Sequence, residues 1–356
     1  MQVKVRRLLV LEGIVPEGSV ELPEGSRLRD LIRRLEELYG PRVGEELIQE
    51  GRLRPDRPVL IGGRGAAGLG GLDAPLRDGV EVVFLVPLAG GASPPADLGR
   101  LEARLRGLER VSVAFSGGVD SGLVLAAAAR ALGPEAVLAL TADAPVHPRR
   151  EVERARSVAR WLGVPHLLVP VAVLDDPEFS ANPVQRCYLC KLKVFGQLQA
   201  VARERGFDLL VDGANASDAS DFRPGQTAAQ ELGVVSPLLE LGLGKPRIRE
   251  LARVVGLPHW ALPPQACLAT RFPFGRRLTA EALAQVESAE DLLLGLGLSQ
   301  VRVRHHGDTA RIEVLPEERG RVLEHAAGVA EGLRSLGFRF VALDLDGYRP
   351  GSLNPG

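Results

Sequence analysis

The sequence predicts an α/β protein built from more than one domain. Its 356 residues exceed the length of one typical domain. From about Leu98, apolar strand-like runs alternate with helical runs, which is typical of a parallel sheet with helices on both faces. One such strand, Val111 to Phe115, leads directly into a glycine-rich turn. The predicted domains are residues 1–91, a linker 92–97, a parallel-sheet domain 98–275, and an α+β lobe 276–356.

The first 91 residues predict a small unit of order β-β-α-β-β. Periodicity and turn signals place a helix at 28–39, closed by Gly40 and Pro41. The expected strands are residues 3–11, 19–22, 59–61 and 80–85. The unit ends in Gly90-Gly91, and the small, proline-rich residues that follow predict a linker.

The parallel-sheet domain is predicted from five strand-like runs. These are residues 111–115, 137–141, 166–173, 207–211 and 234–238, with helices expected at 122–132 and 149–162. Ligands of such sheets bind at the carboxyl ends of the strands. We therefore expect Ser116, Thr141, Asp143 and Asp212 to surround one crevice.

The turn after the first of these strands predicts a phosphate-binding loop. It consists of Ser116, Gly117, Gly118, Val119, Asp120 and Ser121. Backbone N–H groups at a helix N-terminus lack intrahelical acceptors, and the helix dipole adds partial positive charge, so an anionic phosphate fits there. The turn is not a Walker A loop, because no GxxxxGK[ST] pattern is present.

The last segment predicts an α+β lobe. We expect a helix at 280–296, a strand pair around Gly307-Asp308, a helix at 321–336 and a strand at 338–345. The lobe shows no obvious catalytic cluster. We expect it to serve packing or homo-oligomerisation.

Composition narrows the class of partner. The 44 basic and 45 acidic residues leave a formal net charge of −1, which argues against a protein that mainly grips a nucleic-acid backbone. The apolar stretch at 8–11 is too short for a signal peptide, and no run approaches a membrane-spanning length. We expect a cytoplasmic protein that does not bind membranes.

Three cysteines predict a metal site or a reactive thiol. Cys187 and Cys190 have the spacing that lets two thiols reach one metal, and Cys267 can return to the same crevice. Arg186, Lys191 and Lys193 flank Cys187 and Cys190 and are expected to lower the pKa of these two thiols. A structural zinc would need a fourth ligand such as His147, His166 or His259, whereas three cysteines suit an iron–sulfur cluster with one open iron. A redox CxxC pair is the alternative.

The Ser116 to Ser121 turn resembles the PP-loop of the ATP pyrophosphatases, whose domains are adenine nucleotide α-hydrolase-like. The resemblance implies that ATP is cut between its α- and β-phosphates and that a substrate is adenylated. Asp120 is then placed to help hold Mg²⁺ between phosphates. Thr141, at the end of the second strand, joins the expected ATP site.

Four separated blocks resemble the LarE sulfur transferases. They are residues 182–191, 212–238, 266–275 and 343–354, in this order, and the likeness covers roughly residues 98 to 354. It implies synthesis of the nickel-pincer nucleotide cofactor of lactate racemase. That family adenylates a carboxylate of pyridinium-3,5-biscarboxylic acid mononucleotide and converts it to a thiocarboxylate.

The LarE resemblance also implies two sources of sulfur. Some members sacrifice the sulfur of one cysteine, here matched by Cys267. Others resemble this chain in having three cysteines and are thought to hold a [4Fe-4S] cluster, here with Cys187, Cys190 and Cys267 as ligands. Arg186, Arg223 and Arg271 are candidates for the phosphate or carboxylates of the substrate, because guanidinium groups suit both.

The N-terminal β-β-α-β-β order and its Gly90-Gly91 end resemble the ubiquitin-like β-grasp sulfur carriers of the MoaD and ThiS type. In those carriers the terminal Gly-Gly carboxylate becomes a thiocarboxylate. Here Gly91 is followed by Ala92, so only a cleaved chain can carry sulfur. A docking role and a cleaved carrier, with a sulfur-delivery partner, both remain open.

Two other functions stay open from the sequence. A tRNA thiolase shares the PP-loop, although carrier-dependent thiolases resemble a pattern with additional CxxC or CxxH pairs. A carrier or scaffold that acts through residues 1–91 is the second alternative. Both compete with an ATP-dependent transferase that acts on a small nucleotide.

Overall fold

We describe the fold from a computed structural model. It describes residues 1–7, 15, 18–54, 59–62, 64–84, 95–218, 224–263 and 266–349. The chain divides into two compact units by its contacts: residues 1–94 with 251–260, and residues 95–250 with 261–356. The three-domain division expected from the sequence therefore stays a prediction.

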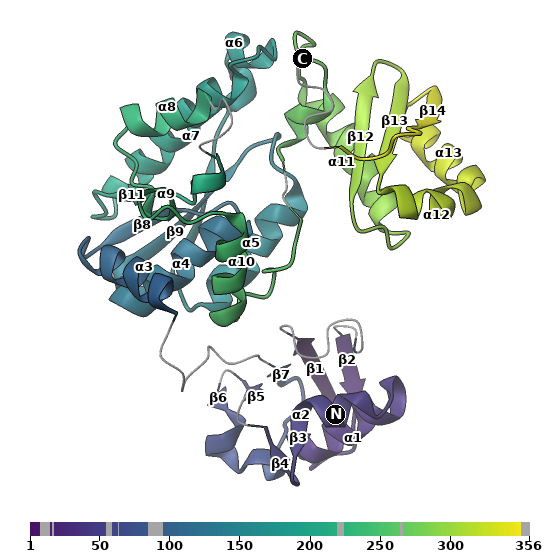
Figure 1. The fold of residues 1–356 in the computed structure, drawn as a ribbon. Helices are drawn as coiled ribbons and strands as arrows, with labels where there is room; N and C mark the ends of the chain where they lie inside the picture. Colours follow the sequence, from purple (N-terminus) through teal and green to yellow (C-terminus); the bar gives the residue numbers. More distant parts are fainter. Residues whose placement is uncertain are drawn as a thin grey trace. The chain divides into compact units, whose positions relative to one another are not determined.

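The N-terminal unit contains a five-stranded mixed sheet of order β2-β1-β7-β5-β6 (Figure 1). Strand β1 pairs antiparallel with β2 and parallel with β7. Helix α1 buries four residues that recur at helical spacing: Leu28, Leu31, Ile32 and Leu35. They belong to one core with residues of β1, β2 and β7. The predicted helix at 28–39 is confirmed.

The elements of this unit follow the order expected from the sequence, with short additions. They are β1 (Gln2–Arg7), β2 (Gly18–Glu21), α1 (Leu28–Tyr39), α2 (Arg42–Leu47), β3 (Ile48–Gln49), β4 (Arg52–Leu53), β5 (Val59–Ile61), β6 (Arg64–Gly65) and β7 (Glu81–Phe84). The first predicted strand extends beyond β1 into residues outside the described part of the chain. Gly90 and Gly91 also lie outside it.

The second unit is built on a four-stranded sheet of order β10-β9-β8-β11. All three neighbouring pairs are parallel, as the alternating pattern predicts. The predicted strand at 234–238 is reduced to a single parallel bridge between Val235 and Val211, because Pro237 begins a short helix there. Helix α7 contacts all four strands and so covers one face of the sheet.

The elements of the sheet region are as follows: α3 (Ala96–Arg106), β8 (Val111–Ala114), α4 (Val119–Leu132), β9 (Val137–Asp143), α5 (Arg149–Trp161), β10 (His166–Pro170), α6 (Pro177–Ser180), α7 (Arg186–Arg203), β11 (Leu210–Val211), α8 (Pro224–Glu231), α9 (Pro237–Glu240) and α10 (Lys245–Val254). Three-residue and four-residue 3₁₀ turns connect several of them.

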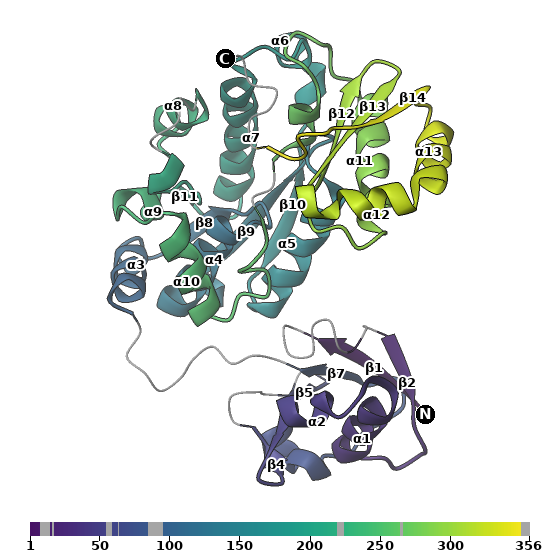
Figure 2. The same cartoon turned by 45° about the vertical axis from the view of Figure 1, so that its right-hand side comes forward.

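The C-terminal part adds a three-stranded sheet of order β12-β13-β14. Gly307, with φ of 75°, turns β12 back into its antiparallel partner β13, and β14 joins in parallel. Figures 1 and 2 both show α11, α12 and α13 grouped with this sheet. The elements are α11 (Ala280–Leu294), β12 (Val301–His306), β13 (Thr309–Val314), α12 (Arg319–Glu324), α13 (Ala326–Ser335) and β14 (Phe340–Leu343).

One predicted helix of this region differs from the structure. Residues 321–336 form parts of two helices, because His325 leaves the helical conformation with φ −106° and ψ 16°. Its ring lies 2.9 Å from the Arg321 carbonyl through Nδ1. A side chain that bonds the backbone of the preceding turn competes with the helical hydrogen-bond pattern.

One hydrophobic core joins the parallel sheet to α11. Leu283 and Val286 of α11 belong to the same buried cluster as Leu140 of β9, Val169 of β10 and Phe272. This shared core explains why the second unit includes both regions. Among the described residues, no helix is long and apolar enough to cross a membrane.

Candidate functional site

The phosphate loop lies where the sequence places it. Strand β8 ends at Ala114, and α4 begins at Val119 with Gly118 as its N-cap. Gly118 has no side chain with which to cap α4, and its N–H donates to Ser116 Oγ within the loop over 3.3 Å. The partial positive charge of the helix dipole is thus directed at the loop, as an anion site requires.

Two glycines let the backbone pack closely around this loop. Gly117 has φ of 77°, and a Cβ there would lie 2.5 Å from the Glu151 carbonyl oxygen of α5. A Cβ on Gly213 would lie 2.5 Å from the backbone nitrogen of Ser121. Ser116 and Ser121 face each other with their hydroxyl oxygens 3.2 Å apart. The loop is therefore defined by close backbone contacts with α5 and with the residues after β11.

Asp120 lies in the first turn of α4 and has two polar partners. Asn215 Nδ2 donates to its Oδ2 over 3.1 Å, and Lys245 Nζ forms an ion pair with the same oxygen. Lys245 is the first residue of α10, and its backbone N–H donates to Ser217 Oγ. A lysine from a distant helix thus brings positive charge to the phosphate loop, which lacks a lysine of its own.

Asp143 is the last residue of β9, and Asp212 directly follows β11. Asp143 pairs with Arg149 over 2.5 Å. Asp212 accepts hydrogen bonds from Ser236 Oγ and from a neighbouring backbone N–H, and it lies 3.7 Å from Lys191 Nζ. Since Lys191 directly follows Cys190, the Asp212 ion pair links the phosphate-loop side of the sheet to the helix that holds two thiols.

The three cysteines converge from two segments. Cys187 and Cys190 lie one turn apart on α7, while Cys267 is the N-cap of the 3₁₀ turn Leu268–Arg271. Cys187 is exposed and the other two are partly buried. A charge on any one of these thiols would act electrostatically on the other two, because each of the three pairs interacts.

Burial raises the pKa values of two of the thiols. It raises the pKa of Cys190 to about 12, and the neighbouring thiols add to the rise more than Lys191 offsets it. The expectation that flanking cations lower the pKa is therefore wrong for Cys190, because desolvation of the thiolate outweighs the nearby positive charge. Burial also raises the pKa of Cys267, against the lowering by Arg186 and Arg271.

The thiols are not arranged as a formed metal centre. Among the residues that the structure describes, no group of three His, Cys, Asp or Glu side chains is placed to hold a metal ion. The thiol set supplies the ligand type of an iron–sulfur cluster, in which each cysteine binds a different iron. The residue types are therefore compatible with a cluster.

The three candidate substrate arginines have different surroundings. Arg186 is buried, donates to Asn182 Oδ1 over 2.8 Å and lies 4.3 Å from the centroid of the Phe274 ring. Arg223 lies outside the described residues. Arg271 is fully buried and forms an ion pair with Glu290 of α11. The described arginines Arg186 and Arg271 thus already hold together the segments that carry the cysteines.

Arg271 connects Glu290 to the backbone around Cys267. Its Nε and Nη2 donate to the two Glu290 oxygens over 2.8 and 2.9 Å, and its Nη1 donates to the carbonyls of Ala266 and Cys267. Glu290 also accepts from Arg150 of α5 and from the Val303 backbone. Burial alone would raise the pKa of Glu290, but the paired Arg271 lowers it, so this carboxylate stays ionised.

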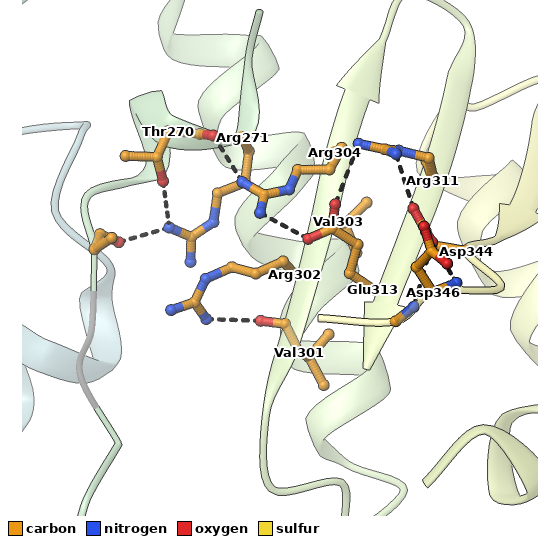
Figure 3. Close-up of polar contacts among 12 residues, drawn as sticks. Thr270, Arg271, Val301, Arg302, Val303, Arg304, Arg311, Glu313, Asp344 and Asp346 are labelled. Atoms are coloured by element: carbon orange, nitrogen blue, oxygen red, sulfur yellow. Dashed lines mark hydrogen bonds and ion pairs between the residues drawn. The ribbon is translucent and has the colours of Figure 1, made fainter. Parts of the chain in front are cut away.

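Two further buried arginines extend from β12 beside Arg271 (Figure 3). Arg304 donates to the Thr270 carbonyl over 2.9 Å and to Glu313 over 2.6 Å. Burial and the charge of Arg271 lower the pKa of Arg302 to about 10. The C-terminal region therefore contributes a cationic cluster next to the Cys267 segment, which periodicity alone did not reveal.

Thr141 does not offer a free hydroxyl. Its side chain is buried and donates to the Phe115 carbonyl over 2.6 Å. The structure thus places Thr141 beside the phosphate loop, as predicted, but directs its hydroxyl to the backbone carbonyl that directly precedes the loop.

Lys245 and Glu290 were missed by the sequence analysis. The one signal for Lys245 was its rarity, as one of four lysines in the chain.

Comparison with known proteins identifies the same region. The family described as asparagine synthase matches residues 100–178, which contain the phosphate loop. An uncharacterised protein of Synechocystis is 42% identical over 69% of this chain and 92% of its own length. The pyridinium-3,5-bisthiocarboxylic acid mononucleotide synthase of Lactiplantibacillus plantarum is 40% identical over 71% of this chain and 92% of its own length.

A third relative, an uncharacterised protein of Methanocaldococcus jannaschii, is 30% identical over 50% of this chain and 69% of its own length. The matches to the first two relatives span nearly their whole length, and the phosphate loop lies inside a matched family region. This chain therefore belongs to the LarE family of sulfur transferases and is an enzyme that uses ATP through a PP-loop domain.

Proposed function

We propose that the protein adenylates a carboxylate of pyridinium-3,5-biscarboxylic acid mononucleotide and converts it to a thiocarboxylate, a step of nickel-pincer nucleotide synthesis. The observation that carries this proposal is the Asp212–Lys191 contact, which joins the PP-loop side of the sheet to the thiol helix. The named relative from Lactiplantibacillus plantarum supports the choice of substrate.

The phosphate loop supplies the activation half of the reaction. A carboxylate is a poor electrophile, and its bond to AMP creates a mixed anhydride with a good leaving group. The N-terminus of α4 would hold the departing pyrophosphate. Asp120 would hold Mg²⁺ between phosphates, and Lys245, now paired with Asp120, would be free to contact phosphate once the metal takes its place.

The three thiols supply the sulfur half. We propose that Cys187, Cys190 and Cys267 bind a [4Fe-4S] cluster, which when bound would carry an additional sulfide on its open iron. The raised pKa values of Cys190 and Cys267 keep these thiols neutral at pH 7, so metal binding must displace their protons. Cys267 as a sacrificial sulfur donor remains the alternative.

The arginines beside the Cys267 segment would recognise the substrate. Arg302 brings positive charge beside Arg271 and suits an anionic mononucleotide, while Arg304 is paired with the buried Glu313 and bonds the Thr270 carbonyl. Arg271 serves to hold that segment, and Arg223 remains a candidate for substrate contact. Arg186 positions the start of α7 through Asn182 and Phe274.

For the N-terminal unit we propose a β-grasp fold of the MoaD and ThiS type. The parallel pairing of β1 with β7 and the packing of α1 against this sheet support it. The matches to the first two relatives cover 69% and 71% of this chain and 92% of each relative, so part of this chain has no counterpart in those matches. A sulfur-delivery partner that docks on this unit, and homo-oligomerisation through the C-terminal lobe, follow as further proposals.

The proposal is tested by the dependence of AMP release on the acceptor. We expect AMP and pyrophosphate to form from ATP only when the pyridinium mononucleotide is present. AMP formation driven by tRNA alone would instead establish a tRNA thiolase. Mass spectrometry of protein from its native host tests the carrier role, since a fragment that ends at Gly91 with sulfur in place of oxygen would support it.

Iron and sulfide analysis of the anaerobically reconstituted protein tests the cluster. We expect both elements to bind, and each of Cys187→Ala, Cys190→Ala and Cys267→Ala to abolish stable binding. A colourless protein with stoichiometric zinc would contradict the cluster. It would leave the adenylation half of the proposal untouched.

A further inference from the structure

Phe115 is the last residue before the phosphate loop, and both of its backbone groups are held. Strand β8 ends one residue earlier, and the Phe115 N–H donates to the Leu140 carbonyl over 2.8 Å. The Phe115 carbonyl accepts from Thr141 Oγ1 over 2.6 Å. A side chain of β9 therefore bonds the last carbonyl at the point where the chain leaves the sheet to form the loop.

The Thr141 hydroxyl has only one proton, which it donates in its hydrogen bond to the Phe115 carbonyl. The carbonyl has no proton to share, so Thr141 must be the donor in that bond. Thr141 Oγ1 also lies 2.9 Å from Nε2 of His166. Toward His166 the hydroxyl can therefore act only as acceptor, and the proton of that bond must sit on Nε2.

The surroundings of His166 keep the ring in this single form. Burial, together with the positive charge of Arg156, lowers the pKa of His166 to about 4. The ring is neutral at physiological pH, with its proton on Nε2. Its plane lies at 67° to the ring of Phe115, with the centroids 6.4 Å apart. His166 thus contacts Phe115 twice, once by ring packing and once through Thr141.

We propose that His166 is a positioning residue that sets the phosphate loop for ATP. The chain of donors runs from His166 on β10 through Thr141 on β9 to the carbonyl that precedes Ser116. It fixes the plane of the peptide that leads into the loop, and with it the direction of the Ser116 N–H. The inference rests on the proposed binding of ATP at this loop, and His166 acts without touching the nucleotide.

The first test measures the tautomer in the absence of nucleotide. In protein labelled with ¹⁵N-histidine, nuclear magnetic resonance should show His166 neutral and protonated on Nε2 between pH 6 and 8. Thr141→Val should change the His166 signals, because the acceptor is lost. A proton on Nδ1, or a ring that titrates near pH 6.5, would overturn the proposal whether or not ATP binds.

The second test measures ATP use with three substitutions. His166→Phe keeps an aromatic ring against Phe115 but removes the donor, so we expect the KM for ATP to rise about fivefold, the usual effect of one lost hydrogen bond, while kcat stays within about twofold. His166→Gln offers an amide N–H and should restore most of the affinity. His325→Gln, on the exposed turn between α12 and α13, is the control.

The pattern of the three substitutions decides between positioning and plain stability. An unchanged KM in the Phe variant together with a loss in the Gln variant would show that only ring packing matters and would overturn the proposal. Equal losses in both variants would show that a donor does not restore the affinity, and would overturn it as well. Calorimetry measures the affinity of each folded variant for ATP, and the variants are compared where their thermal unfolding midpoints match. This separates a loss of ATP affinity from a loss of folding stability. Failure of the wild-type protein to bind ATP would contradict the proposed function, while the tautomer measurement would still stand by itself.

Discussion

The phosphate loop and the thiol region are held in place by different kinds of interaction. The loop is defined mainly by backbone contacts, since Gly117 packs against α5 and Gly213 against α4, and the six loop residues themselves follow one another in sequence. The Cys267 segment is held by a buried ion pair between Arg271 and Glu290, which comes from another helix. A local pattern is sufficient for the first, whereas the second depends on the assembled second unit.

This comparison predicts a large effect from closing the space at Gly117. In Gly117→Ala the new Cβ would meet the Glu151 carbonyl at 2.5 Å, and φ of 77° would strain any other residue. We expect ATP-dependent turnover to fall by about 100-fold or more, because a shift of the loop by 1 Å misplaces the phosphates. Initial rates of AMP release measure it.

A matched glycine separates strain from contact. Gly133 has φ of 84° at the end of α4, but a Cβ there meets no atom within 4 Å. Gly133→Ala should cost about 1 kcal/mol of stability and leave the KM for ATP unchanged. Equal losses of turnover in both variants would show that backbone strain alone explains the effect at Gly117.

In the thiol region the expected effect is on stability first. Glu290→Gln leaves the fully buried Arg271 guanidinium without its ion-pair partner, so we expect the free energy of unfolding to fall by about 3–5 kcal/mol. Denaturant unfolding followed by circular dichroism measures the loss. Asp291→Asn removes an exposed partner of Arg150 and should cost less than about 1 kcal/mol. Similar losses in both would contradict the central role of the Arg271–Glu290 pair.

A smaller effect is expected at Lys245, which belongs to the loop side. Lys245→Met removes the cation that pairs with Asp120, and we expect about a tenfold rise in the KM for Mg²⁺-ATP. The matched control is Lys4→Met on β1 of the N-terminal unit. An unchanged KM would restrict Lys245 to a structural contact with Asp120.

The smallest effect concerns the pH dependence of the thiols. Because burial raises the pKa of Cys190 and Cys267, their thiolate fraction is low at pH 7 and rises only in alkaline solution. Alkylation of metal-free protein by iodoacetamide, followed by peptide mass spectrometry, should label both residues slowly at pH 7 and faster at pH 10. Rapid labelling of Cys190 at pH 7 would contradict the burial that the structure shows.

The same contrast explains how much could be predicted from the sequence. The helix at 28–39, the phosphate loop and the parallel arrangement of the strands follow from periodicity and turn residues that act over short distances. The three cysteines could be named, but their raised pKa values could not, because burial is a property of the folded chain. Lys245 lies 125 residues from Asp120, and Glu290 lies 19 residues from Arg271, so no local pattern connects either pair.

In the proposed two-part site, the phosphate loop activates the substrate carboxylate and the thiols deliver the sulfur. The most direct measurement follows AMP and the thiocarboxylate product together in Cys267→Ala, with ATP, Mg²⁺ and pyridinium-3,5-biscarboxylic acid mononucleotide present. We predict that AMP still forms while the thiocarboxylate, measured by mass spectrometry, falls below detection. A variant that makes the thiocarboxylate at the wild-type rate would contradict the two-part site.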